Sequence, residues 1–229
     1  MASLGFRWTV VSAADYPEIA RGDAPAGFLS PEEARALAKL LFPERRRKWL
    51  LGRLAAKTLI ADETGASFME ITIGNDPSGA PYAEMAGEGR IGRVISISHR
   101  AQWGLAAIGD VGVTALGVDM EITEARTDFT GDFFTPREIA AVDRAGAERD
   151  LAIARTWSAK EAALKALGVG LRIDTRAIEV GDVGGESVQG WTPVRISTSG
   201  GVAFAGPARA YWQRGPGYVM TAVVVGKPG

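Results

Sequence analysis

The chain has 229 residues, of which 46% are hydrophobic and 23% charged, with a formal net charge of −1 and a pI near 6.0. This composition is typical of a soluble globular protein of one domain or two small ones, and the balanced charge gives no general field that would hold nucleic acid. The chain contains one histidine and no cysteine. The absence of cysteine excludes disulfides, cysteine nucleophiles and thiolate zinc sites. Because no apolar run approaches a membrane span and the first residues lack the pattern of a signal peptide, we expect a cytoplasmic location.

The first part of the sequence predicts a strand and then a helix. The apolar stretch from Phe6 to Val11 reads as the strand. Ser30, Pro31 and Glu33 then form the pattern of a capping box, with the hydroxyl as the helix cap and the carboxylate three residues later. This helix should run to about residue 42, where a proline interrupts it.

A basic helix is predicted over residues 44–60. Leucines and alanines at helical spacing predict its buried stripe, at Leu51, Leu54, Ala55 and Leu59. Arg46, Arg53 and Lys57 fall together away from that stripe. Two interpretations of these cations stay open, a solvated helix face and a phosphate-binding edge.

The middle of the sequence predicts a long turn and a hairpin. Glycines and prolines mark residues 74–82 as the turn, and residues 93–99 and 104–109 read as two paired strands. In an extended strand Ser98 and His99 point to opposite faces, so they cannot act together as nucleophile and base. The histidine could be structural or functional.

A strand over residues 113–122 carries Asp119 and Glu121 on the same face. Two adjacent carboxylates repel each other unless a cation is bound between them. The alternative interpretation is a solvated strand edge.

The second half of the sequence predicts a loop over residues 128–132 and then a second capping box, from Thr135 to Glu138. Ala, Leu, Lys and Glu predict a central helix after it, which Gly168 ends. Trp157, Glu161 and Lys165 lie along one side of that helix. Glu161 and Lys165 could form an ordinary surface ion pair or belong to a site.

Two similar halves are predicted, because capping boxes recur and because Trp49 and Lys57 have the same spacing of eight as Trp157 and Lys165. The alternative is coincidence. We expect an α+β fold with halves at residues 1–112 and 113–229, each a small antiparallel sheet with packed helices, related by a pseudo-twofold axis. In that arrangement cations of the first half would face the carboxylates of the second across a cleft, which suits a polyphosphate bridged by a metal.

Gly117-Val118-Asp119-Met120-Glu121, followed by Trp157-Ser158-Ala159-Lys160-Glu161-Ala162 with Lys165 in place, resembles the paired signature of the 4′-phosphopantetheinyl transferases. The duplicated halves and Ser98-His99 look like the larger, pseudodimeric group typified by the surfactin-type enzyme. The resemblance implies transfer of phosphopantetheine from coenzyme A to a serine of an acyl or peptidyl carrier protein, with release of adenosine 3′,5′-bisphosphate.

The resemblance also implies roles for individual residues. Asp119, Glu121 and Glu161 would bind Mg²⁺, and Glu161 would accept the serine proton, so that Glu161, Lys165 and Asp119 form the catalytic set. Substrate binding would fall to Arg46, Arg53, Gly79, Pro81, Ser98, His99, Lys160 and Lys165, with Arg45 and Arg47 as alternatives for the arginines. Some relatives carry Gly-Lys-Pro where this chain has Gly79-Ala80-Pro81, which puts one charged contact to the nucleotide in doubt. The segment from Thr127 to Phe134 would meet the carrier.

Two other functions compete with transfer. A non-catalytic, coenzyme A-binding regulator of the same fold would keep the pocket without the reaction. Nucleic-acid binding through residues 45–48 is poorly supported by the overall charge. We therefore expect coenzyme A and a carrier protein as partners, no nucleic acid or membrane partner, and a monomer.

Overall fold

The computed structural model describes residues 3–124, 129–182 and 185–228, and the chain divides into two compact units. The N-terminal unit is Phe6–Val111, and the C-terminal unit is Gly112–Gly229 together with Met1–Gly5. No helix within the described ranges is both long enough and apolar enough to cross a membrane. Each unit is described by itself below.

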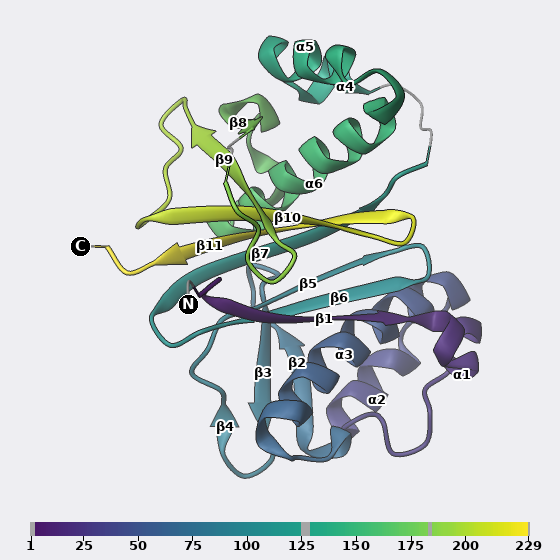
Figure 1. Cartoon of the computed structure of the whole chain (residues 1–229). Helices are drawn as coiled ribbons and strands as arrows, with labels where there is room; N and C mark the ends of the chain where they lie inside the picture. Colours follow the sequence, from purple (N-terminus) through teal and green to yellow (C-terminus); the bar gives the residue numbers. More distant parts are fainter. Residues whose placement is uncertain (1–2, 125–128, 183–184, 229) are drawn as a thin grey trace. The chain divides into compact units, whose positions relative to one another are not determined.

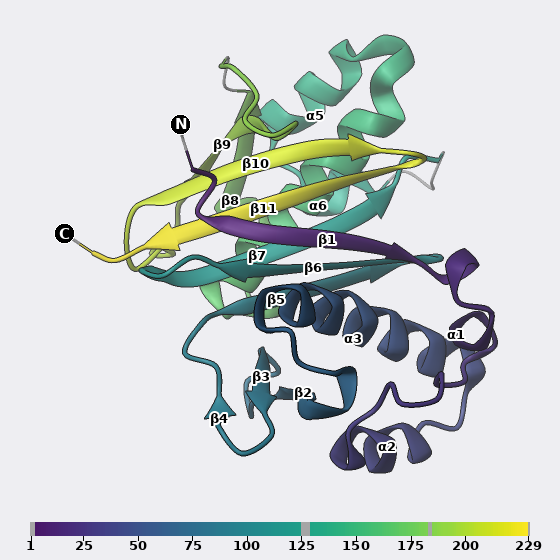
Figure 2. The same ribbon diagram turned by 60° about the horizontal axis from the view of Figure 1, so that its bottom comes forward.

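The N-terminal unit combines helices with two small antiparallel sheets (Figure 1). Its helices are α1 (Pro17–Arg21), α2 (Pro31–Ala38) and α3 (Pro43–Thr64). Its strands are β1 (Phe6–Ser12), β2 (Ile71–Asn75), β3 (Pro81–Met85), β4 (Gly89–Arg90), β5 (Ile95–Arg100) and β6 (Trp103–Gly109). One sheet has the order β1-β6-β5 and the other β2-β3-β4. Figure 2 shows α3 lying along one face of the first sheet.

The predicted pattern of the N-terminal unit is largely confirmed. The four residues of the expected stripe on α3 are all buried, and β5 pairs with β6 in an antiparallel hairpin. The capping box also forms, since the Ser30 amide donates to Glu33 Oε2 (3.1 Å) and the Glu33 amide to Ser30 Oγ (3.3 Å). Helix α2 ends earlier than expected, at Ala38, and Phe42 becomes the cap residue of α3.

The C-terminal unit is a five-stranded antiparallel sheet with helices on it (Figure 1). The strand order is β7-β11-β10-β9-β8, with β7 (Val113–Ile122), β8 (Ile178–Asp182), β9 (Thr192–Thr198), β10 (Ala208–Gly215) and β11 (Tyr218–Gly226). The helices are α4 (Thr130–Phe133), α5 (Pro136–Arg144) and α6 (Arg149–Leu167). Helix α6 packs across β7 and β11, and the α+β class expected from the sequence is confirmed.

Three features of the C-terminal unit test the sequence predictions closely. Strand β7 has the predicted bounds, and α6 ends at Gly168, whose φ of 68° is left-handed. The expected loop at residues 128–132 is wrong for its second part, because residues from Thr130 form the short helix α4. Asp128 lies outside the described residues.

Helix α6 approaches β7 at a glycine. A Cβ atom placed on Gly117 would lie 1.9 Å from the carbonyl oxygen of Ala162 and 2.6 Å from the amide nitrogen of Ala166, both in α6. These are backbone atoms, so they cannot move aside as a flexible side chain would. Only glycine at position 117 allows this separation of strand and helix.

Replacing Gly117 by alanine should therefore lower the free energy of unfolding by on the order of 2 kcal/mol, because α6 must move away from the sheet. Urea unfolding followed by circular dichroism measures the change. Gly131→Ala is the matched control, since a Cβ there meets nothing within 4 Å, and it should leave the unfolding midpoint unchanged. Equal midpoints for both variants would contradict the steric constraint.

Candidate functional site

The contact between α6 and β7 brings Lys165 to Asp119. Lys165 Nζ donates to Asp119 Oδ1 (2.8 Å) and to the carbonyl oxygen of Val118 (2.9 Å). Asp119 is 6% exposed, and the Lys165 side chain is 31% exposed. Lys165 thus forms an ion pair from helix to strand, and the interpretation of a simple surface pair within α6 is wrong.

Glu161 lies in the same electrostatic environment, one helical turn before Lys165. Burial raises the pKa of the Glu161 carboxyl, and the negative charges of Asp119 and Glu121 raise it further, while Lys165 opposes them. Asp119 and Glu121 are each only 6% exposed, so the alternative of a solvated strand edge is also wrong. Three carboxylates and one ammonium therefore influence one another in the C-terminal unit.

The donor atoms of this group fit Mg²⁺, which prefers oxygen ligands. Among the described residues, however, no three or more His, Cys, Asp or Glu side chains are grouped so that they could hold a metal ion together. The expected three-carboxylate site of Asp119, Glu121 and Glu161 is therefore not preformed. Mg²⁺ usually binds one or two carboxylates and completes its shell with waters and substrate phosphates, so the chemistry remains compatible with it.

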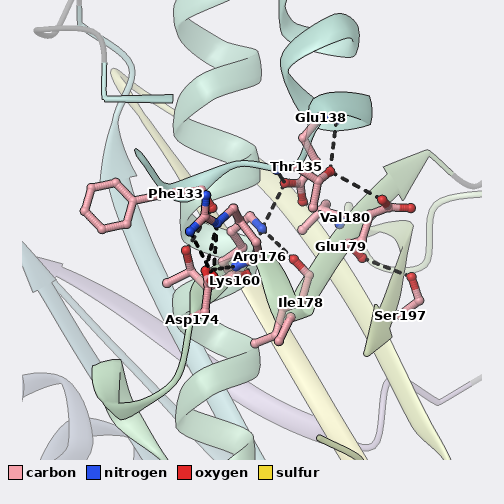
Figure 3. A network of polar contacts seen from close by, with 12 residues as sticks. Phe133, Thr135, Glu138, Lys160, Asp174, Arg176, Ile178, Glu179, Val180 and Ser197 are labelled. Atoms are coloured by element: carbon pink, nitrogen blue, oxygen red, sulfur yellow. Dashed lines mark hydrogen bonds and ion pairs between the residues drawn. The ribbon is translucent and has the colours of Figure 1, made fainter. Parts of the chain in front are cut away.

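Lys160, which was expected to contact substrate, is instead a buried structural cation (Figure 3). Its Nζ is 2.9 Å from Glu138 Oε2 and donates to the carbonyl oxygens of Thr175 (3.0 Å) and Ile178. The residue is 0% exposed, and burial lowers its pKa while the Glu138 carboxylate opposes that shift. The predicted contact of Lys160 with a substrate phosphate is corrected, because the three donors of its ammonium are already used.

The N-terminal unit contains an equivalent ion pair. Lys57 Nζ pairs with Glu33 Oε2 and donates to the carbonyl oxygens of Phe28 and Phe68 (2.8 Å each). Lys57 is 0% exposed, which excludes both the solvated face and the phosphate-binding edge for this residue. We call each pair a buried brace: Glu33 with Lys57, and Glu138 with Lys160. In the sequence, the carboxylate of each brace is the glutamate of a capping box, a pattern that by itself predicts only a helix cap.

The two arginines expected to bind phosphate also contact the backbone of their own unit. Arg46 donates from Nε to the Gly22 carbonyl (2.7 Å) and from Nη1 to the Leu37 carbonyl (3.3 Å). Arg53 donates to the Ile73 carbonyl (3.1 Å), stacks on the Trp49 ring at 3.4 Å, and its side chain is 11% exposed. These contacts indicate structural roles, and phosphate binding by either residue stays a prediction.

Arg45 and Arg47, the alternatives left open by the sequence, are placed differently. Arg45 is exposed, with its guanidinium 5.8 Å from the centre of the Phe42 ring. Arg47 is partly exposed, and its Nε is buried without a hydrogen-bond partner among the described residues. A guanidinium with an unused donor is better suited to an incoming phosphate than one that holds carbonyl oxygens.

The remaining predicted substrate contacts lie in the N-terminal unit. Gly79, with φ of 93°, belongs to a turn organised by Asp76, whose Oδ1 accepts the Ser78 amide (2.8 Å) and the Ala80 amide (3.0 Å), and Pro81 is the first residue of β3. The strand β5 buries Ser98 and exposes His99, as its alternation predicted. Their roles in binding coenzyme A stay predictions.

Sequence reasoning missed an aromatic group beside Glu161. The rings of Phe129 and Phe133 lie 5.4 and 5.1 Å from the Trp157 ring, and Phe133 is 37% exposed. We call these three residues the aromatic wall. The signal available in the sequence is the pair of phenylalanines directly before Thr135. Thr127, the first residue of the expected carrier-binding segment, lies outside the described residues.

Comparison with known proteins covers the three carboxylates and the lysine of the candidate site. The family model described as the 4′-phosphopantetheinyl transferase superfamily matches residues 115–196, which include Asp119, Glu121, Glu161 and Lys165. Over these residues the chain is similar to this superfamily.

Named members of the superfamily resemble the chain over part of their length. The 4′-phosphopantetheinyl transferase HetI of Nostoc sp. is 29% identical over 166 residues, which are 69% of this chain and 66% of that protein. A phosphopantetheinyl transferase of Thraustochytrium sp. is 27% identical over 158 residues, which are 62% of this chain and 54% of that protein. The chain thus matches less than two thirds of the length of these relatives. The crystal structure of Thermotoga maritima holo-acyl-carrier-protein synthase is 20% identical with a TM-score of 0.43, covering 50% of this chain and 64% of that chain, a likeness too limited to support a function.

If Arg46 is structural, Arg46→Ala should lower the free energy of unfolding by about 1 to 3 kcal/mol, because it leaves the carbonyl oxygens of Gly22 and Leu37 without their charged donor. Thermal or urea unfolding measures the loss. The neighbouring exposed Arg45→Ala should stay within about 0.5 kcal/mol of the parent. Equal stability of the two variants would show that the carbonyl contacts of Arg46 contribute nothing.

Proposed function

We propose that this chain transfers the 4′-phosphopantetheine group of coenzyme A to a serine of an apo acyl or peptidyl carrier protein, in a Mg²⁺-dependent reaction that releases adenosine 3′,5′-bisphosphate. The observation that carries the proposal is the arrangement of Asp119, Glu161 and Lys165 at the contact of α6 with β7. These residues lie within the segment that matches the superfamily. Relatives that bear the name of the activity support it.

In the proposed reaction the serine oxygen attacks the phosphorus joined to the pantetheine arm. The bond from that phosphorus to the bridging oxygen breaks, and the bridging oxygen leaves with the nucleotide. Glu161 accepts the serine proton through a water, because a hydroxyl needs a base to become a nucleophile. Its raised pKa suits this role, since a carboxylate in a partly buried, negatively charged environment binds a proton more readily.

Lys165 and Asp119 serve to compensate the negative charge of the diphosphate, the first directly and the second through the bound metal ion. The Lys165 ammonium is held at 2.8 Å from Asp119 Oδ1, and this contact orients it beside the position proposed for the diphosphate. When bound by Asp119 and Glu161, Mg²⁺ would neutralise the diphosphate and orient it. The ligands from the chain are few enough to leave room for phosphate oxygens.

We assign the 3′-phosphate of coenzyme A to Arg47, with Arg45 beside it, and no longer to Arg46 and Arg53. Arg46 and Arg53 each donate to a backbone carbonyl oxygen, whereas Arg47 donates to none among the described residues, and this difference supports the choice. Guanidinium groups bind phosphate through paired donors.

Glu161→Gln should lower kcat for transfer by at least about 100-fold, because the amide cannot accept the proton. The measurement is the intact mass of an apo carrier incubated with coenzyme A and Mg²⁺, which should rise by one phosphopantetheine. Glu148→Gln, at an exposed carboxylate that pairs with Arg214, is the control and should retain parental activity.

The intact-mass assay of the carrier also decides between transferase activity and the non-catalytic, coenzyme A-binding regulator. If the parent protein leaves several diverse carriers unmodified, the transferase proposal is wrong. Calorimetry showing tight coenzyme A binding that is indifferent to Mg²⁺ would then support the regulator.

Arg47→Ala should raise the KM for coenzyme A by about 10-fold and leave kcat nearly unchanged, because a charge-assisted pair to the 3′-phosphate is lost. The KM for dephospho-coenzyme A, which lacks this phosphate, should change by less than about 2-fold. Arg35→Ala is the control, since Arg35 is exposed and pairs with Glu32. An equal rise of KM for both substrates would remove the 3′-phosphate from Arg47.

A further inference from the structure

The buried brace of the C-terminal unit joins four segments of the chain. Lys160 comes from α6 and Glu138 from α5, and the carbonyl oxygens that accept from Lys160 belong to Thr175 and Ile178. Glu138 Oε1 also accepts the amide of Val180 in β8 (2.7 Å). Figure 3 shows these contacts converging on the Lys160–Glu138 pair. One ion pair therefore fixes α5, α6, the turn at Thr175–Ala177 and β8 to one another.

From this brace a short chain of hydrogen bonds leads to the aromatic wall. Thr175 Oγ1 donates to the carbonyl oxygen of Phe133 (2.8 Å), so the turn held by Lys160 also holds the backbone of Phe133. Two residues later, the Thr135 amide donates to Glu138 Oε2 (2.7 Å), and Thr135 Oγ1 donates to Glu179 Oε2 (3.3 Å). The segment that carries Phe133 is therefore fixed to the brace on both sides of Phe134.

The aromatic wall is related to Glu161 through Trp157. Trp157 is one helical turn before Glu161 on α6, and the rings of Phe129 and Phe133 pack edge to face on it. Helix α6 by itself positions only Trp157. The positions of Phe129 and Phe133 depend on α4 and on the residues that lead into α5, which the brace holds.

The N-terminal brace provides an internal comparison. Glu33 there accepts the amides of Ser30 (3.1 Å) and Ile73 (3.0 Å), as Glu138 accepts those of its own cap residue and its own following strand. The ring nearest to Lys57 is Phe28, which is 2% exposed and packs on Phe68 inside the core of that unit. The two braces are thus alike in construction, and only the C-terminal one supports a partly exposed aromatic group beside the proposed base.

We propose that Lys160 and Glu138 are positioning residues for phosphopantetheinyl transfer, which hold Phe129 and Phe133 on Trp157 so that the aromatic wall stands beside Glu161. This inference rests on the proposed function. The wall gives the base an apolar side that shields it from bulk solvent and orients the acceptor serine. Lys160 therefore acts through the wall and touches neither coenzyme A nor the carrier.

The test compares two double variants, Glu138→Gln with Lys160→Met and Glu33→Gln with Lys57→Met. Each removes both charges of one brace and keeps an amide oxygen as acceptor, but the N-terminal double variant also deprives Arg53, whose side chain is 11% exposed, of the Glu33 carboxylate. We expect the N-terminal double variant to lose at least as much stability as the C-terminal one. The C-terminal double variant should lower kcat by about 10-fold or more with the KM for coenzyme A unchanged within about 2-fold, while the N-terminal double variant keeps kcat within about 3-fold.

Amide hydrogen exchange provides a readout that does not need activity. In the C-terminal double variant the segment 129–135 should exchange faster, while residues 157–166 of α6 stay protected. If kcat falls equally in both double variants, or if exchange of 129–135 is unchanged, the positioning role is wrong. If the parent protein transfers nothing, the proposed function fails, and the exchange experiment still decides whether the brace holds the aromatic wall.

Discussion

The contact of α6 with β7 at Gly117 is the constraint on which the candidate site depends. Without a side chain at that position, the backbone of α6 at Ala162 lies directly against the strand. Lys165 can then reach Asp119, two residues further along β7, at 2.8 Å, and Glu161 comes under the influence of the Asp119 charge. A wider separation would place the ammonium beyond hydrogen-bond distance and return the carboxylates to solvent.

A buried Glu–Lys pair supports each unit, and it corrects the internal correspondence expected from the sequence. The spacing of tryptophan and lysine had matched Lys57 with Lys165, but the residue that shares the contacts of Lys57 is Lys160, five positions earlier. Glu161 and Lys165 therefore lie outside the repeated brace, and α3 has threonine and aspartate at the corresponding positions 58 and 62. One helix scaffold thus occurs twice, while the carboxylate and ammonium of the proposed site occur on one copy only.

The cationic side chains of this chain have two roles, holding backbone carbonyl oxygens and, as proposed, binding phosphate. The sequence does not distinguish the residues that have one role from those that have the other. Arg46, Arg53, Lys57 and Lys160 donate to backbone carbonyl oxygens and thereby join α3 and α6 to other segments of their own units. Desolvation makes such a buried cation costly unless its donors are satisfied, which explains why these residues have several partners each. The Nε atoms of Arg47 and Arg53 both lack a hydrogen-bond partner among the described residues, but Arg53 also donates to the Ile73 carbonyl and Arg47 donates to no carbonyl oxygen there. This difference moves the proposed phosphate contact to Arg47.

Local patterns in the sequence were sufficient to predict both capping boxes, the strand β7, the β5–β6 hairpin, the buried stripe of α3 and the glycine that ends α6. They also placed Glu161 and Lys165 on one side of α6 and Asp119 and Glu121 on one face of β7, because helical and strand periodicities place side chains on a face irrespective of what lies opposite. The partner of each charge was decided only by the tertiary structure. Glu138 meets Lys160 across 22 positions of sequence, and Lys165 meets Asp119 across 46, since those distances depend on how closely helix and sheet pack.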